Sequence, residues 1–290
     1  MWTEKAYSDD PQHLSVGIAN IHPRDGRLDE NRQRIRFVLA KCAEYEVNLA
    51  VFPEYCLSGF LRDKPQNSLT NDRLDQCTEW LDELVRTYID DTLQYIILNG
   101  LLKNGSGKEE YFNTSIVLDR TGNHFSPERS YKKTFLFGLE KTCLSSGVND
   151  TLVLATEWGR LGFLTCNDIC FPQVAHNLVQ NQKVDAIIVQ AAWRKQGRRF
   201  YPGLNLREKA YNQFLWNLIL PALACQNQVW VIAANAVGPH SLQGLDYCGC
   251  SGIWAPSGLN LLQASDTREE FLILHNLDLS SDRDAEYRSE

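Results

Sequence analysis

The sequence predicts an α/β protein with buried sheets, and the prediction depends on two repeating patterns and on length. Short apolar runs typical of strands alternate with longer stretches whose apolar residues recur every three or four positions, as on one helix face. Such alternation is typical of sheets covered by helices. The chain has 290 residues, which is enough for one domain with a large core. No repeat or linker divides it, so we expect a single domain over residues 1–290.

Apolar runs bounded by turn residues give the expected strands. They cover residues 14–20, 48–53, 94–102, 113–118, 151–156, 160–165, 185–191, 229–234, 251–255 and 270–275. Asn104-Gly105 and Thr121-Gly122-Asn123 carry the glycines that hairpin turns require, so we expect a turn at each place. Several of the longer connections between strands are then left for helices.

Apolar stripes give the expected helices. Residues 27–45 carry one stripe, formed by Leu28, Ile35, Val38, Leu39 and Cys42. The next stripe is formed by Leu74, Cys77, Leu81, Leu84 and Val85. A further helix is expected over residues 204–220, with a stripe formed by Tyr211, Phe214, Leu215 and Leu218. That stripe fits either core packing or contact with another subunit.

Composition excludes several classes of protein. A net charge of −7 and a pI near 5.5 argue against a general nucleic-acid binder, which would show a basic face. No apolar stretch is long enough to cross a bilayer, and the first residues lack a basic region followed by an apolar core. Nine cysteines without a secretory signal fit reduced thiols. We therefore expect a cytoplasmic protein with no nucleic-acid or membrane partner.

The most informative segment is the apolar run that ends in Cys166-Asn167-Asp168. A thiol at the end of a strand faces the first N–H groups of the following turn, which stabilise its thiolate. Such a thiol can attack a carbonyl or nitrile carbon, so Cys166 is the candidate nucleophile. The alternative is a structural role, because free cysteine commonly behaves as a small buried hydrophobe.

Two other segments supply charged groups suited to the same chemistry. Pro53 ends the apolar run 48–53 and places Glu54 at the carboxyl end of a strand, where open α/β sheets bind ligands. Residues 131–140 place Lys133 and Glu140 on a loop between two strand-rich stretches. Carboxylate, ammonium and thiol are together the groups needed for acyl transfer through a thioester. As alternatives, Glu54 could begin a helix, and Glu140 could form a solvated surface pair with Lys141.

In these segments the chain resembles the nitrilase superfamily of carbon–nitrogen hydrolases. The superfamily's catalytic signature is a Glu after an apolar run and Pro, a Lys in a Tyr-x-Lys segment and a Cys followed by x-Asp. Here these are Phe52-Pro53-Glu54, Tyr131-Lys132-Lys133 and Cys166-Asn167-Asp168, in the same order. The resemblance extends over nearly the whole chain, including residues 14–19, 171–173, 229–235, 249–253 and 256–258. It implies a four-layer α-β-β-α sandwich.

The resemblance also implies a role for each residue of the signature. Glu54 would be the general base that takes the proton from Cys166 and later activates water. Lys133 and the backbone N–H of Asn167 would hold the oxyanion. Glu140 corresponds to the superfamily's second glutamate and would orient the substrate. Lys132 is the alternative to Lys133 for the oxyanion role, and the superfamily's Tyr-x-Lys spacing favours Lys133. Asp168 is expected to be a cap or to hold the backbone.

Substrate recognition is expected beside these groups. Tyr55 follows Glu54, and Trp193 follows the strand at 185–191, so both are expected at the pocket. Arg194 and Arg198, with their neighbours Lys195 and Arg199, could hold a carboxylate or phosphate of the substrate. The alternatives are a solvated loop or a subunit contact. Phe135, Cys170 and Gln226 stand where many members have His, Arg and Glu, which leaves the substrate class open.

These observations lead to one expected activity and three alternatives. The chain is expected to hydrolyse a nonpeptide carbon–nitrogen bond of a small molecule, as an amidase or an N-carbamoyl amide hydrolase working through a thioester. The alternatives are a nitrilase proper, an acyl transferase to an amine, and a noncatalytic binding member. No metal and no organic cofactor are expected, because the cysteine pairs lack zinc-site spacing. The resemblance implies a homodimer or larger assembly, through residues 171–180 and the helix expected at 204–220.

Overall fold

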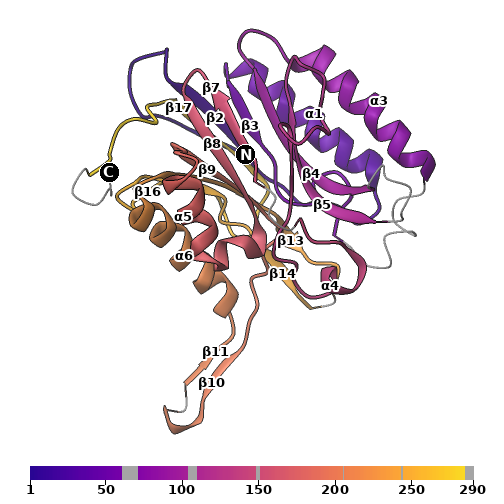
Figure 1. Ribbon diagram of the computed structural model, residues 1–290. Helices are drawn as coiled ribbons and strands as arrows, with labels where there is room; N and C mark the ends of the chain where they lie inside the picture. Colours follow the sequence, from indigo (N-terminus) through magenta and orange to yellow (C-terminus); the bar gives the residue numbers. More distant parts are fainter. Residues whose placement is uncertain (61–70, 104–109, 148–150, 205, 243, 285–290) are drawn as a thin grey trace.

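The chain forms two large sheets in a computed structural model that describes residues 1–60, 71–103, 110–147, 151–204, 206–242 and 244–284. Helices cover the outer face of each sheet, and the inner faces pack against each other (Figure 1). The order from one outside to the other is helix, sheet, sheet, helix. The expected four-layer α-β-β-α sandwich is therefore confirmed.

The first sheet has seven strands in the order β1-β17-β2-β3-β4-β5-β6. Their bounds are Trp2–Ala6 for β1, Glu270–Leu277 for β17, Leu14–Asn20 for β2, Leu49–Val51 for β3, Tyr95–Lys103 for β4, Tyr111–Leu118 for β5 and Ser130–Lys132 for β6. Every residue of β2, β3 and β5 is buried, because layers cover both sides of these strands. β2, β3 and β4 run parallel, so the carboxyl end of β3 lies on the edge where Glu54 is expected.

The second sheet has six strands in the order β16-β15-β12-β9-β8-β7. Their bounds are Asn260–Gln263 for β16, Gly252–Trp254 for β15, Trp230–Asn235 for β12, Ala186–Ala191 for β9, Gly159–Thr165 for β8 and Val153–Thr156 for β7. β8, β9 and β12 are parallel, and Thr165 of β8 is paired with Gln190 of β9. The residues after β8 and β9 therefore emerge side by side.

Helices α1 (Leu28–Glu44) and α3 (Asn71–Tyr88) cover the first sheet, and α5 (Pro172–Gln180) and α6 (Tyr211–Asn227) cover the second. The stripe of α1 is buried as expected at Ile35, Val38, Leu39 and Cys42. In α3, Leu81 and Leu84 are buried, whereas Leu74 lies outside the residues whose side chains are described. Leu14, Ile18, Phe163, Ile188 and Trp230 belong to the core between the two sheets.

One expected element is wrong in its boundaries. The helix expected over residues 204–220 begins only at Tyr211 and continues to Asn227. The residues before it form an antiparallel pair, β10 (Arg199–Tyr201) and β11 (Leu206–Glu208), joined through the short helix η2 (Pro202–Leu204). Pro202 and Gly203, just before the expected helix, favour the turn between the two strands. We call β10, η2 and β11 the arm, and it projects from the body in Figure 1.

The remaining expectations are met in part. A turn contains Gly122, whose φ of +70° suits glycine, and the expected turn at residues 104–105 lies outside the described residues. The short strands β1, β6, β13 (Val237–Pro239), β14 (Asp246–Cys248) and β16 are not in the sequence-based assignment. They are three to five residues long, which is too short for a periodic signal.

Candidate active site

Glu54 lies just past the end of β3 and is fixed against the second sheet. Only 1% of its surface is exposed. The amide of Gln190 on β9 donates to the Phe52 carbonyl over 2.6 Å, which ties the end of β3 to the other sheet. The backbone N–H of Ala192 then donates to Glu54 Oε2 over 2.7 Å. The next residue, Tyr55, has a left-handed φ of +61°, a conformation often kept at functional sites.

Lys133 follows β6 and lies between two buried carboxylates. Its Nζ is 2.8 Å from Glu54 Oε1 and 2.8 Å from Glu140 Oε2, and all three side chains are almost fully buried. Gly147 packs on the backbone of this strand so closely that an added Cβ would lie 2.2 Å from the Lys132 carbonyl oxygen. The Lys132 ammonium lies over the Phe112 ring instead of in this cluster. The structure therefore places Lys133, and not Lys132, between the carboxylates.

Glu140 begins the short helix α4 (Glu140–Cys143) and accepts several hydrogen bonds. The Tyr55 hydroxyl donates to Oε1, and the Phe137 N–H donates to Oε2 over 2.8 Å. Burial by itself would raise the pKa of Glu140, but the Lys133 ammonium and these donors hold it below the usual 4.5. Glu140 is therefore an ionised carboxylate, and its expected alternative as a solvated surface group is wrong.

Asn113 of β5 joins the two carboxylates and was not found from the sequence. Its Nδ2 donates to Glu54 Oε1 over 2.7 Å and to Glu140 Oε1 over 2.8 Å. Its oxygen accepts from Asn99 Nδ2 of β4 over 2.9 Å, and Asn99 Oδ1 accepts the Tyr55 N–H over 2.7 Å. Asn99 and Asn113 stand inside apolar strand segments, and this was the signal available in the sequence. A buried amide requires hydrogen-bond partners, so such a residue indicates a polar site nearby.

Cys166 stands at the end of β8, at the start of the 3-10 helix η1 (Cys166–Cys170). Its φ is +50°, an unfavourable value for a residue with a Cβ, and it is held there by a reciprocal cap between Thr165 and Asp168. Asp168 also accepts from the Tyr131 hydroxyl over 2.7 Å and from the Phe135 N–H over 2.8 Å. The expectation that Asp168 is a cap and holds the backbone is confirmed.

The electrostatics of the site favour a neutral thiol beside a carboxylate. Burial, and then the negative Glu54, raise the pKa of Cys166 well above its usual 9.0. Burial also raises the pKa of Glu54 above 4.5, although Lys133 opposes it. Burial opposes the charge of Lys133, but the attraction of Glu54 and Glu140 outweighs it and raises the pKa of Lys133 well above 10.5. The cluster thus contains a protonated ammonium, a thiol and a carboxyl group that can accept the thiol's proton.

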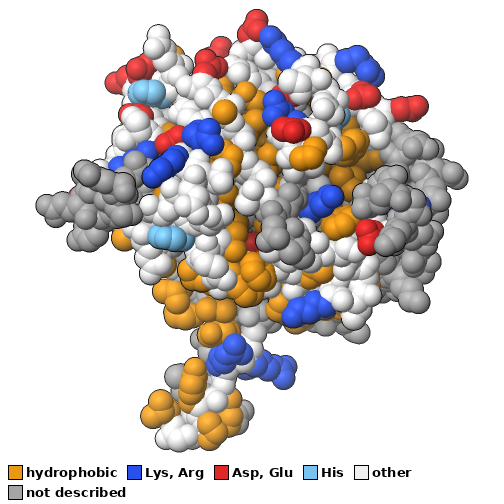
Figure 2. All heavy atoms as spheres, viewed as in Figure 1, with side chains coloured by type: hydrophobic (Ala, Val, Ile, Leu, Met, Phe, Trp, Pro, Cys, Tyr) orange, Lys and Arg blue, Asp and Glu red, His pale blue; other side chains and the backbone are white. Residues whose placement is uncertain are grey.

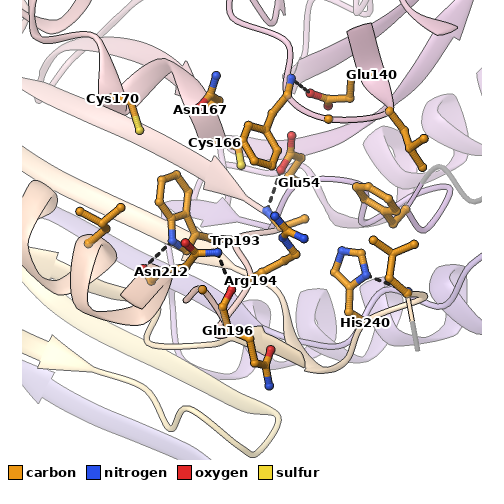
Figure 3. A pocket seen from close by; sticks show the side chains of 18 of the residues that line it. Glu54, Glu140, Cys166, Asn167, Cys170, Trp193, Arg194, Gln196, Asn212 and His240 are labelled. Atoms are coloured by element: carbon orange, nitrogen blue, oxygen red, sulfur yellow. Dashed lines mark hydrogen bonds between the residues drawn. The ribbon is translucent and has the colours of Figure 1, made fainter. Parts of the chain in front are cut away.

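These groups line one cavity of about 740 Å³. Figure 3 shows Cys166 and Glu54 close together in it, with Trp193, Arg194 and His240 on another wall. Asn167 also lines the cavity, and its side chain donates to the Phe135 carbonyl over 3.2 Å. Its N–H belongs to the first turn of η1, where backbone donors have no partner within the helix. The cavity therefore brings together all four residues expected to be catalytic.

The residues expected to bind substrate are only partly in the cavity. Tyr55, Trp193 and Arg194 line it, and Trp193 Nε1 donates to the Asn212 carbonyl over 2.7 Å. Arg198 is exposed and does not line it, so the structure does not support the expected contact. Its neighbour Arg199 lines the cavity and lies 3.9 Å from the centroid of the Tyr211 ring.

The described residues show two further negative findings. Among them, no group of three or more His, Cys, Asp and Glu side chains is arranged to hold a metal ion. No helix in the same part of the chain is long and apolar enough to span a membrane. Cys170, which stands where many superfamily members have arginine, lines the cavity as a thiol whose pKa burial raises.

Comparison with known proteins places the chain among its relatives. The sequence profile of the carbon-nitrogen hydrolase family matches residues 15–287. A probable nitrilase of Schizosaccharomyces pombe is 29% identical over 274 residues, covering 91% of this chain and 89% of the relative. A hydrolase of Pseudomonas protegens is 31% identical over 269 residues, covering 91% of this chain and 83% of the relative.

Solved structures agree on the fold. A mutant of the Nesterenkonia AN1 amidase from the nitrilase superfamily superposes with a TM-score of 0.77 and 21% identity, covering 97% of each chain. At that identity the likeness concerns the fold, whereas the sequence matches extend to the family. Family profile, relatives and fold therefore agree that this chain belongs to the carbon-nitrogen hydrolase family, within the nitrilase superfamily, and is a hydrolase of carbon–nitrogen bonds.

Proposed function

We propose that the chain is a cysteine-dependent amidase that hydrolyses amide or carbamoyl groups of small molecules through a thioester. The observation that carries the proposal is the cluster in which Lys133 Nζ lies 2.8 Å from Glu54 Oε1 and 2.8 Å from Glu140 Oε2, beside the Cys166 thiol. The Nesterenkonia amidase offers support by analogy, since fluoroacetamide adds its acetamide moiety to the active-site cysteine of a mutant of that enzyme.

In the first half-reaction the Cys166 sulfur attacks the carbonyl carbon of the amide. Glu54 takes the thiol proton as the S–C bond forms. The carbonyl oxygen becomes an oxyanion, which Lys133 Nζ and the backbone N–H of Asn167 stabilise. The C–N bond then breaks, the proton on Glu54 passes to the leaving nitrogen, and ammonia or an amine departs. A thioester between the acyl group and Cys166 is left.

In the second half-reaction water replaces the amine. Glu54 takes a proton from water as the oxygen attacks the thioester carbon, and the same donors hold the second oxyanion. The S–C bond breaks, the proton returns from Glu54 to the Cys166 sulfur, and the carboxylic acid leaves. The raised pKa of Glu54 makes it a better proton acceptor than an ordinary carboxylate, because base strength follows pKa. Ionised Glu140 keeps Lys133 protonated throughout.

The test is covalent labelling and turnover with matched cysteine variants. Wild type, Cys166→Ala and Cys170→Ala are incubated with fluoroacetamide and weighed by intact-mass spectrometry, and ammonia release is followed on amides, carbamoyl compounds and nitriles. Cys170 is the matched control because it lines the same cavity. We expect an adduct in wild type and Cys170→Ala and none in Cys166→Ala. Turnover that survives in Cys166→Ala would refute the nucleophile.

The same panel separates the alternative activities. Release of ammonia from nitriles alone would identify a nitrilase proper. An acylated amine formed on addition of hydroxylamine, in place of the free acid, would identify an acyl transferase. Absence of both adduct and turnover in wild type would favour a noncatalytic binding member. The Glu54–Lys133–Glu140 cluster supports catalysis, since a buried ion cluster costs desolvation and is not required for a stable core.

We also propose that the chain forms a homodimer or larger assembly through the outer face of α6. The stripe expected there is not core, because 56% of Phe214 and 50% of Leu218 are exposed. Apolar side chains Phe200, Tyr201 and Leu204 are exposed on the arm nearby, and Figure 2 shows hydrophobic side chains on this projection. Light scattering coupled to size exclusion is expected to show dissociation in Phe214→Glu, with exposed Phe37→Glu on α1 as control. A monomeric wild type would refute the proposal.

A further inference from the structure

The cavity wall away from the thiol carries a cation that no described carboxylate neutralises. Three basic side chains line the cavity: Lys133, Arg194 and Arg199. Lys133 is held by Glu54 and Glu140, and Arg199 is an exposed residue stacked on Tyr211. Within the described residues, Arg194 has no Asp or Glu within 4.0 Å and no side-chain hydrogen bond. A half-buried guanidinium without an anion is a ready binding group for one.

An aromatic ring lies next to the Arg194 guanidinium. Its guanidinium carbon lies 5.5 Å from the centroid of the Phe137 ring. A guanidinium over an aromatic face gains a cation–π attraction, and its N–H groups remain available in the guanidinium plane. Two of these N–H groups match the spacing of the two oxygens of a carboxylate, which favours a bidentate pair. Arg194 thus places a paired donor group on the wall of the cavity.

His240 supplies a second, uncharged donor next to Arg194. It follows β13, is 7% exposed and lines the cavity. Its Nδ1 accepts the Leu242 N–H over 3.0 Å, so in the neutral ring the proton is on Nε2. Burial, followed by the nearby Arg194, lowers the pKa of His240 to about 4. Figure 3 shows the other ring nitrogen turned toward Arg194.

The cavity that this pair shares with the thiol is lined largely by apolar side chains. Its walls are formed by Phe60, Trp193, Leu139, Leu215 and Leu242. The Phe60 and Tyr247 rings lie 4.7 Å and 4.6 Å from the His240 ring centroid and fix its position. Apolar walls favour a methylene chain over a polar spacer. A substrate that fits carries the reacting amide at one end, an apolar chain in the middle and an anion at the other end.

We propose that Arg194 and His240 form a carboxylate subsite, and that the preferred substrates are small primary amides whose acyl chain ends in a carboxylate. This proposal rests on the amidase activity proposed above and adds its substrate class. A carboxylate is favoured over a phosphate because one fork and one neutral donor suit two oxygens and a single negative charge. Lys195 of the same segment does not serve the subsite, since its Nζ lies 2.7 Å from Asp266 Oδ2.

The first experiment compares matched substrates. Monoamides of linear dicarboxylic acids of increasing length are compared with their methyl esters, which have the same chain without the charge. We expect kcat/KM to favour the acids and to peak at one length. In Arg194→Met the acid-to-ester ratio of kcat/KM is expected to fall about 10- to 100-fold, chiefly through KM, as for loss of a hydrogen-bonded charge. Arg194→Lys retains part of the preference, and His240→Phe loses less of it.

Lys195→Met is the matched control and is expected to keep the wild-type ratio. An equal ratio in wild type and Arg194→Met would overturn the subsite. Calorimetry on Cys166→Ala tests it without turnover: the diacid products are expected to bind, and Arg194→Met in that background to weaken them about tenfold or more. Tighter binding of phosphonate analogues would overturn the assignment to carboxylates. If no amide is hydrolysed and fluoroacetamide labels nothing, the proposed function fails, whereas Arg194-dependent diacid binding in Cys166→Ala would still support the subsite.

Discussion

Two walls of one cavity differ in how their charges are balanced. Around Glu54, every charged group is almost fully buried and has an opposite charge or a hydrogen-bond donor within reach. Around Arg194, the cation is half-buried, stacked on Phe137 and without a described carboxylate. The first arrangement keeps fixed protonation states and geometry, as bond-making requires. The second leaves binding capacity for a charge that the substrate brings.

The largest effect is expected from removing the cation that lies between the two buried carboxylates of the first wall. Lys133→Met leaves Glu54 and Glu140 buried without their ammonium, so we expect the free energy of unfolding to fall by about 3–5 kcal/mol and turnover to be lost. Urea unfolding and ammonia release measure these effects. Lys132→Met is the control, because its ammonium lies over Phe112 outside the cluster. Similar losses in both variants would contradict the assignment of Lys133.

The next effect comes from a neutral member of the same wall. In Asn113→Ala, Glu54 and Glu140 each lose a buried donor, which is expected to cost about 1–3 kcal/mol of stability. Asn113 lowers the pKa of Glu54, so its removal raises that pKa further. Because the active form has Glu54 ionised, the acid limb of the kcat/KM profile should move to higher pH. An unshifted limb would show that Asn113 acts only on stability.

On the second wall, a smaller effect is expected from pH. The pKa of His240 is lowered from 6.5 to about 4, so between these values the unfolded chain binds a proton that the folded chain does not. Stability from neutral His240 is therefore present above pH 6.5 and is lost as the pH falls toward 4. Melting temperatures across this window should fall less steeply in His240→Gln than in wild type. Exposed His176→Gln is the control, and equal slopes in wild type and His240→Gln would contradict a neutral buried ring.

The smallest effect is expected at the neighbour of Arg194. Lys195 and Asp266 form a partly exposed ion pair 2.7 Å apart, and such pairs contribute about 0–1 kcal/mol. Asp266→Asn should therefore change unfolding by less than about 1 kcal/mol and leave amide hydrolysis close to wild type. A large loss of activity in Asp266→Asn would show that Lys195 and Arg194 act together on the substrate. It would contradict the view that Arg194 is the unpaired cation of the second wall.

The sequence was most informative where local order decides structure. Pro53 ends a strand and presents Glu54, and the run before Cys166 delivers the thiol to a turn, because strand and turn chemistry act over a few residues. Lys133 was distinguished from Lys132 by the superfamily's Tyr-x-Lys spacing, with which alternation along a strand agrees, and the cavity contains Lys133. Residues 204–210 were assigned to a helix because the apolar stripe at Tyr211 and beyond was extended backwards, and β11 occupies part of this stretch instead.

By itself, the sequence determined the order of the main strands and helices and pointed to four side chains that meet in one cavity, since these depend on periodicity and on motifs a few residues long. Tertiary structure alone decided that Asn113 joins Glu54 to Glu140 and that His240 faces Arg194. These partners meet across separate strands and loops, at distances along the chain that no local pattern encodes. Their positions follow from sheet register and layer packing, which the chain as a whole must satisfy.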